Sequence, residues 1–322
     1  MTFDEKLEYF PEIPESMLQA ANSGNLVPFI GAGVSKLAGC PSWAELADKA
    51  LLYFVEQGDI NFAKLSQLEK MSPKMKLNLA CGLEERTNKK IDFHKLLDYQ
   101  QIKDGTLGSG LYGSIQNLGK LIITTNYDNW LDVQHNLSTI STASANKLPP
   151  VQNIIYEYKD IKPTLLADIG SGVVHLHGSI MKRDSMVITT QDYLNRYANG
   201  GGGVRNEYLE FLSQIFSERQ ILFIGYGLEE LEILEYVFLK SPYKKIEKFN
   251  HYVLQGFFSH EQELVDQLKQ YYQQFNIILL PYLKDALDWH QLIGVLKAYS
   301  EKIPARSQTI TQAKIAMRNA EI

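Results

Sequence analysis

Side chains able to do chemistry stand at the ends of apolar runs in this sequence. The run Lys120–Thr124 is followed by Asn126 and Asp128, an amide and a carboxylate two residues apart. A later run carries His175 and His177, and in a strand this alternation places both imidazoles on one face. A histidine at a strand end can exchange protons near neutral pH, so His177 is the stronger candidate for acid–base work.

Two glycine turns follow apolar runs in the same way. The first is Gly31-Ala32-Gly33, followed by Ser35, and the second is Gly225-Tyr226-Gly227. A strand, a glycine turn and a helix together bring main-chain N–H groups up to a phosphate. The second turn is suited to flank a ribose or an adenine. Neither turn has the Gly-Lys-Ser/Thr ending of a nucleoside-triphosphate P-loop, which disfavours GTP or ATP hydrolysis.

Each of these motifs also has a purely structural interpretation. Asn126 and Asp128 are good helix caps. The default for His175 is a buried, hydrogen-bonded side chain. A glycine turn can simply relieve backbone strain. The motifs taken singly leave these alternatives open.

The elements that must position these residues alternate between strand and helix. This pattern predicts an α/β fold: a Rossmann-like, mostly parallel sheet with helices on both faces. In such a sheet ligands bind beyond the carboxyl ends of the strands, where all the motifs above fall. Beside the run that ends at Ile30, the predicted strands are Lys120–Thr124, Asn153–Tyr158, Val173–Ser179, Met186–Thr189, Gln220–Ile224, His251–Gln255 and Ile277–Leu280.

A helical insertion of about residues 58–117 is expected after the first strand, as a small cap beside the sheet. It follows a helix over Ser42–Gln57, whose Ser42 and Glu45 have capping-box spacing. We expect one domain over residues 1–300 and a polar tail over 301–322. Other predicted helices include Pro14–Ala21, Asn61–Met71, Pro73–Thr87, Ile91–Gln101, Asn129–Gln134, Gln191–Tyr197, Tyr208–Phe216, Glu229–Leu239, Glu261–Tyr272 and Leu287–Tyr299, with a loop over 136–150.

Composition excludes several classes of protein. The 322 residues carry a formal net charge of -5, which argues against a whole-surface basic footprint, and we expect no direct nucleic-acid binding. The two cysteines, Cys40 and Cys81, cannot build a four-thiolate zinc site, so no metal is expected. There is no secretory signal and no apolar run of about 20 residues. These features predict a cytoplasmic protein without a membrane segment.

Taken together, the motifs resemble the sirtuin superfamily. The resemblance is to its bacterial, zinc-free branch of sirtuin-like NADase domains in antiphage defence. The motifs occur in the family's order over roughly residues 26 to 240. The matching segments are Gly31–Ser35, Thr124–Asp128, His175–Ser179, Val187–Tyr193 and Phe223–Gly227.

The resemblance implies a role for individual residues. Asn126 and His177 would be catalytic. The glycine turn at Gly31 would hold the NAD pyrophosphate and adjoining ribose, and the turn at Gly225 the adenosine side, while Asp128 would lie by the nicotinamide. The residues assigned in this way to NAD binding are Gly31, Ala32, Gly33, Ser35, Thr125, Asp128, Gly225, Tyr226 and Gly227.

The chain also departs from the sirtuins that contain zinc. Their zinc module of two cysteine pairs frames the acyl-lysine groove, and this chain cannot build it. Thr125 stands where they have Gln, and Ser42-Trp43 stands where they have Phe-Arg. These departures favour hydrolysis of NAD to nicotinamide and ADP-ribose, depleting cellular NAD as the effector of an antiviral, abortive-infection system.

Two other functions are compatible with the resemblance. One is an NAD-dependent protein deacylase, and the other is a non-catalytic regulatory module that binds NAD or ADP-ribose. A defence NADase has to be silent until triggered. We therefore expect a homo-oligomer, a partner ATPase or sensor chain, or a regulatory domain beyond the tail.

Overall fold

The computed structural model describes residues 7–97, 107–132, 154–161, 172–197, 206–227 and 249–303. The predicted loop over 136–150, the predicted helix Glu229–Leu239 and the tail beyond residue 303 lie outside these residues. Among the helices that the structure describes, none is long and apolar enough to cross a membrane.

A seven-stranded sheet forms the centre of the molecule, and every strand pair in it is parallel. This confirms the Rossmann-like α/β prediction. The spatial order is β3-β4-β2-β1-β5-β6-β7. The strands are β1 (Leu26–Ile30), β2 (Leu121–Thr124), β3 (Ile154–Ile155), β4 (Gly172–His175), β5 (Gln220–Ile224), β6 (His251–Phe257) and β7 (Ile277–Leu283).

The strand order creates a switch point between β1 and β5. The chain leaves β1 to build β2, β3 and β4 on one side and then returns to β5 on the other side. Residues Leu26–Ile30 pair in register with Gln220–Ile224. In open parallel sheets a ligand crevice forms where the strand order reverses in this way.

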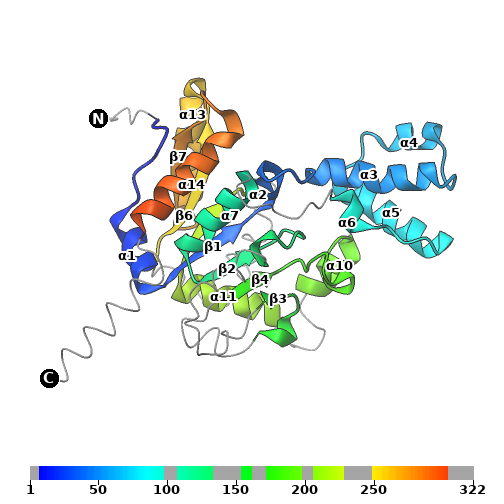
Figure 1. The fold of residues 1–322 in the computed structure, drawn as a ribbon, viewed down its shortest axis with the longest axis horizontal. Helices are drawn as coiled ribbons and strands as arrows, with labels where there is room; N and C mark the ends of the chain where they lie inside the picture. The colour runs from blue at the N-terminus through cyan, green and yellow to red at the C-terminus, as the bar shows by residue number, and fades with distance from the viewer. Residues whose placement is uncertain are drawn as a thin grey trace.

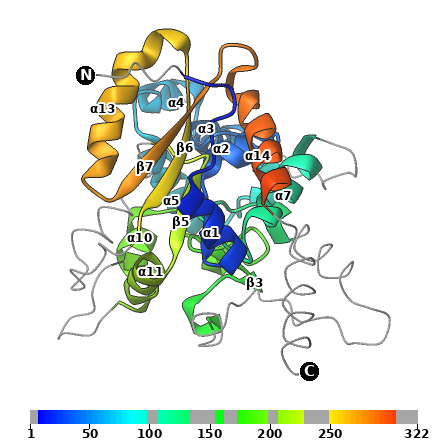
Figure 2. The same cartoon turned by 90° about the vertical axis from the view of Figure 1, so that its left-hand side faces the viewer.

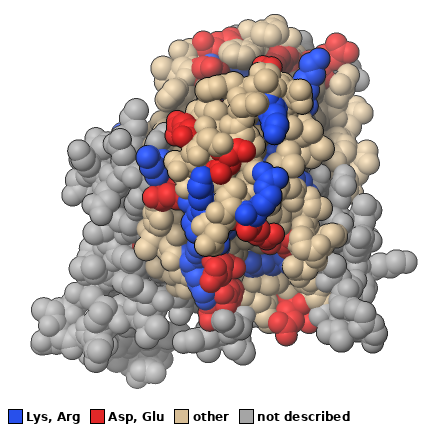
Figure 3. All heavy atoms as spheres, turned by 90° about the vertical axis from the view of Figure 1, so that its right-hand side faces the viewer, with Lys and Arg blue, Asp and Glu red and all other residues tan. Residues whose placement is uncertain are grey.

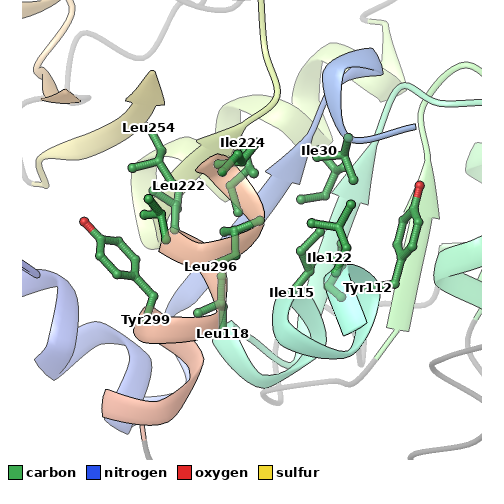
Figure 4. Close-up of a cluster of buried hydrophobic side chains, with 14 of the residues drawn as sticks. Ile30, Tyr112, Ile115, Leu118, Ile122, Leu222, Ile224, Leu254, Leu296 and Tyr299 are labelled. Atoms are coloured by element: carbon green, nitrogen blue, oxygen red, sulfur yellow. The ribbon is translucent and has the colours of Figure 1, made fainter. Parts of the chain in front are cut away.

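Helices cover both faces of the sheet because its central strands are apolar on both sides. In β1, Val27 and Phe29 enter one core cluster, while Leu26 and Ile30 enter the other. Helices α1 (Glu15–Ser23), α7 (Leu107–Leu118) and α14 (Gln291–Lys302) pack on the second cluster, part of which is shown in Figure 4. Helices α11 (Glu207–Glu218) and α13 (Gln262–Gln273) cover the opposite face (Figure 2).

A group of helices stands beside the sheet as a cap (Figure 1). Its bounds differ from the predicted insertion of about residues 58–117, because the preceding helix packs within the cap while α7 packs on the sheet. It has its own buried cluster, which also takes in Tyr127, Ile180 and Ile188 from loops at the sheet's edge. On the face that the cap presents, positive and negative side chains are interspersed (Figure 3). The helices of the cap are α3 (Trp43–Glu56), α4 (Phe62–Leu68), α5 (Pro73–Thr87) and α6 (Phe93–Leu96).

Several local predictions are corrected by the structure. The predicted strand Met186–Thr189 is wrong: the segment is irregular, because Met186 and Ile188 turn into the cap cluster instead of pairing with a strand. A short helix, α2 (Ala32–Leu37), begins directly after Gly31, ahead of the helix predicted from Ser42. That later helix, α3, does begin with the predicted capping box of Ser42 and Glu45.

Candidate functional site at the carboxyl edge of the sheet

The two glycine turns meet at the switch point and pack against each other. The Gly31 N–H donates to the carbonyl of Ile224 and the Gly33 N–H to that of Gly225, each at 2.9 Å. A Cβ on Gly33 would lie 2.8 Å from the Gly225 oxygen, and one on Gly225 would lie 2.7 Å from the Val34 nitrogen. Gly225 also has a φ of +66°, in the left-handed region. The close contact between the two main chains therefore explains by itself why Gly33 and Gly225 must both be glycine.

The other residues of these turns have different surroundings. Ala32 is exposed in the first turn of α2. The Tyr226 ring is buried against Phe29, with the ring centroids 5.3 Å apart. A Cβ on Gly227 would meet no described residue within 4 Å. The part of the chain that the structure describes therefore sets no steric need for glycine at Gly227.

Ser35 and Asp128 hold each other. The Ser35 hydroxyl donates to Asp128 Oδ2 at 2.5 Å, and the other carboxylate oxygen accepts from the Trp130 N–H at 3.2 Å and from the Tyr112 hydroxyl at 3.4 Å. Burial raises the pKa of Asp128, and the hydrogen bond from Ser35 opposes this rise. The contact fixes α2 to the end of β2.

Asn126 lies at the end of β2 with most of its polar groups held by the protein. Its N–H donates to Thr124 Oγ1 and its side-chain Nδ2 donates to the Gly31 carbonyl, each at 3.0 Å. The Asn126 Oδ1 and the Thr125 hydroxyl oxygen are buried without a hydrogen-bond partner among the described residues. Such atoms are rare in native proteins and mark places where a ligand or water is expected.

His177 follows the end of β4, the strand next to β2, and is enclosed by aromatic rings. Tyr193 and Tyr197 of α10 (Thr190–Tyr197) lie edge-on to it, with centroids at 5.1 and 5.9 Å. Its Nε2 is inaccessible to solvent and has no partner within the described part of the chain. Burial, together with Arg196 and Lys74, lowers the pKa of His177 to about 3, so the ring is neutral at pH 7.

The backbone around His177 leaves it little freedom. The His177 carbonyl accepts from the Val187 N–H at 2.9 Å. The next residue, Gly178, has a φ of +74°, and a Cβ there would lie 2.1 Å from the Ser185 oxygen. Only glycine fits this position, so the turn holds His177 at the strand end.

His175, by contrast, belongs to a buried polar network. One ring nitrogen lies 2.8 Å from Asp132 Oδ1 and the other lies 3.2 Å from the main-chain oxygen of Asn126. The other Asp132 oxygen accepts from the Tyr156 hydroxyl at 3.0 Å. The geometry fits the predicted buried, hydrogen-bonded histidine. No sequence pattern predicts Asp132 and Tyr156 as neighbours of His175, or Tyr193 and Tyr197 as neighbours of His177.

Candidate metal ligands do not gather in this structure. Among the residues that it describes, no three His, Cys, Asp or Glu side chains form a group that could hold a metal ion. Cys40 is buried and Cys81 is partly exposed.

The fold and its switch point define a Rossmann-like α/β domain. Residues 120–279 match the model of the family described as SIR2-like domain. This confirms the sirtuin-like resemblance found in the sequence motifs. The matched region includes Asn126, His177 and the second glycine turn, but not the first.

The chain is also similar to a curated protein, "Defense-associated sirtuin 2" of Bacillus subtilis. The two are 26% identical over 235 residues, which cover 70% of this chain and 20% of that protein. The alignment therefore extends over about a fifth of the relative's length.

Proposed function

We propose that the chain cleaves NAD with water, releasing nicotinamide and ADP-ribose, in an antiviral defence system. The SIR2-like domain supports NAD as the substrate, and the name of the Bacillus subtilis relative supports the setting in defence. The observation that carries the proposal is a set of buried polar atoms without protein partners at neighbouring strand ends. Within the described residues these are Thr125 Oγ1, Asn126 Oδ1 and His177 Nε2.

The reaction breaks the bond between nicotinamide and ribose C1′, and its electron pair leaves with the nicotinamide ring nitrogen. A water oxygen then forms the new bond to C1′ and loses a proton. We infer that Asn126 Oδ1 accepts a hydrogen bond from a ribose hydroxyl or from that water. His177, which is neutral, accepts the proton, a role that typically contributes about 10²–10⁴-fold.

His177 has to become accessible before it can act. Its Nε2 is sealed from solvent beneath Tyr193 and Tyr197, and a pKa of about 3 makes the buried ring a weak base. Burial is the largest cause of that low pKa, so admission of water or substrate raises it. This closed arrangement is compatible with an enzyme that stays silent until triggered.

The deciding assay mixes purified protein with NAD and follows nicotinamide and ADP-ribose by chromatography. Asn126→Ala and His177→Ala should each abolish most release while the chain still folds, as shown by a cooperative thermal transition. His251→Asn is the matched control. His251 is also buried, but it is the first residue of β6 and so lies at the amino ends of the strands, away from the candidate site.

The same assay separates the other two candidate functions. A protein deacylase releases nicotinamide only when an acyl-lysine peptide is present. A binding module takes up NAD or ADP-ribose, measured by calorimetry, without any product. Absence of nicotinamide release from a chain assayed with and without its trigger or partner would refute the NADase proposal.

Regulation and location complete the proposal. We propose that the chain works in the cytoplasm as a homo-oligomer or with a partner ATPase or sensor chain. Light scattering with and without NAD measures the mass of the assembly. A mass of 36.6 kDa under all conditions would contradict self-association.

A further inference from the structure

Each ring nitrogen of the buried His175 faces a hydrogen-bond acceptor in this structure. Its ring nitrogens face a main-chain carbonyl oxygen and a carboxylate oxygen, at 3.2 and 2.8 Å. A carbonyl only accepts hydrogen bonds, so the nitrogen facing Asn126 must carry a proton. The proton between His175 and Asp132 belongs on the imidazole, which is a stronger base than a carboxylate. Both nitrogens are then protonated, and the ring is an imidazolium.

The surrounding charges agree with this assignment. Burial lowers the pKa of His175, but the charge of Asp132 and the hydrogen bonds to Asp132 and Asn126 outweigh burial and raise it overall. Asp128 adds to the rise. Tyr156, which donates to the second oxygen of Asp132, keeps that carboxylate in place, and its ring lies 5.2 Å from the imidazole.

The cation is bonded to the residue that the proposed reaction depends on. Asn126 has four polar groups, and three of them are fixed: the N–H by Thr124, the side-chain Nδ2 by Gly31 and the carbonyl by His175. Only Oδ1 is left, buried and without a partner among the described residues. Loss of the His175 contact would free the peptide plane that carries this side chain.

We propose that His175, paired with Asp132, is a positioning residue that holds the Asn126 amide in the orientation needed for NAD cleavage. The inference rests on the proposed function. It gives His175 and His177 separate tasks, although they are two residues apart on one strand end: the first fixes Asn126, and the second exchanges protons.

Two substitutions of His175 by amide residues each keep one of its hydrogen bonds and remove the other. In His175→Asn the new Nδ2 stands near the place of Nδ1, so it can donate to Asn126 but loses Asp132. In His175→Gln the new Nε2 stands near the place of Nε2, so it keeps Asp132 but loses Asn126. We expect His175→Gln to lower kcat about 100-fold with KM for NAD changed by less than about threefold. His175→Asn should retain at least about ten times the kcat of His175→Gln.

The test is whether His175→Asn has a higher kcat than His175→Gln. If His175 had only a structural role, both variants would be less stable but their kcat values would not differ from each other. The control His251→Asn should leave kcat unchanged. Equal kcat values for the two His175 variants, or a loss expressed in KM alone, would overturn the proposal.

Nuclear magnetic resonance of the parent chain tests the same inference without turnover. In protein labelled with ¹⁵N-histidine, both His175 nitrogens should be protonated at pH 7.5. The Asn126 side-chain amide signal, assigned by its loss in Asn126→Ala, should move in His175→Gln and stay in place in His175→Asn. A neutral His175 or an unmoved Asn126 signal would refute the positioning role, even if the parent never cleaves NAD. In that last case the proposed function fails separately.

Discussion

Substitution of the glycines at the switch point tests whether each glycine is required for packing between the two turns or for binding NAD. Gly33 and Gly225 are required by their contacts with each other, since added Cβ atoms would lie 2.8 and 2.7 Å from main-chain atoms of the facing turn. Gly227 belongs to the same motif, but a Cβ there would meet nothing within 4 Å in the described residues. Alanine substitutions at these positions should therefore affect stability very differently.

The magnitudes follow from the local geometry. Gly225→Ala places a side chain at a φ of +66°, which costs about 1–2 kcal/mol, and overpacking adds about 1–3 kcal/mol. Gly33→Ala meets the same overpacking cost but gains about 1 kcal/mol of helix propensity within α2. Gly227→Ala should stay within about 0.5 kcal/mol of the parent.

Urea unfolding at equilibrium measures these free energies, and the KM for NAD is measured on the same samples. We expect the order Gly225→Ala, Gly33→Ala, Gly227→Ala from most to least destabilised. Gly227→Ala should raise KM if its backbone lies close to the adenosine. Equal destabilisation by Gly225→Ala and Gly227→Ala would refute the steric reasoning.

Three further outcomes are expected. His177 and His251 have pKa values lowered to about 3 and about 4, so the unfolded chain binds more protons than the folded one below about pH 6.5. Moving from pH 7.5 to pH 5 should therefore remove about 2 kcal/mol of stability for each, and an unchanged urea midpoint would contradict this. Gly178→Ala should lower the free energy of unfolding by more than about 3 kcal/mol, because its Cβ meets the Ser185 main chain; a thermal melt like the parent's would rule this out. Lys74→Gln should raise the pKa of His177, followed by an NMR titration, because a nearby positive charge is removed.

Local sequence patterns were sufficient for the main elements. The alternation in β1 sends Val27 and Phe29 to one core and Leu26 and Ile30 to the other, so burial on both faces is visible in the residue types themselves. The capping box of α3 is likewise a contact between residues three apart in sequence. Patterns of this kind depend only on residues that are close together along the chain, so they can be recognised in the sequence.

The errors arose where tertiary packing overrode such patterns. Met186–Thr189 is as apolar as a strand, but Met186 and Ile188 enter the cap's core instead of the sheet. The helix α2 was missed because its start is fixed by the Gly225 turn, which comes from a distant part of the chain.

The sequence by itself determined the order of strands and helices, the two glycine turns and the polar residues at strand ends, because each depends on residues close together along the chain. Only the tertiary structure decided what those residues do to one another. Ser35 holds Asp128 across 93 positions, and His175 holds Asn126 across 49. The roles of Gly33, His175 and the rings above His177 follow from packing between elements that no local pattern relates.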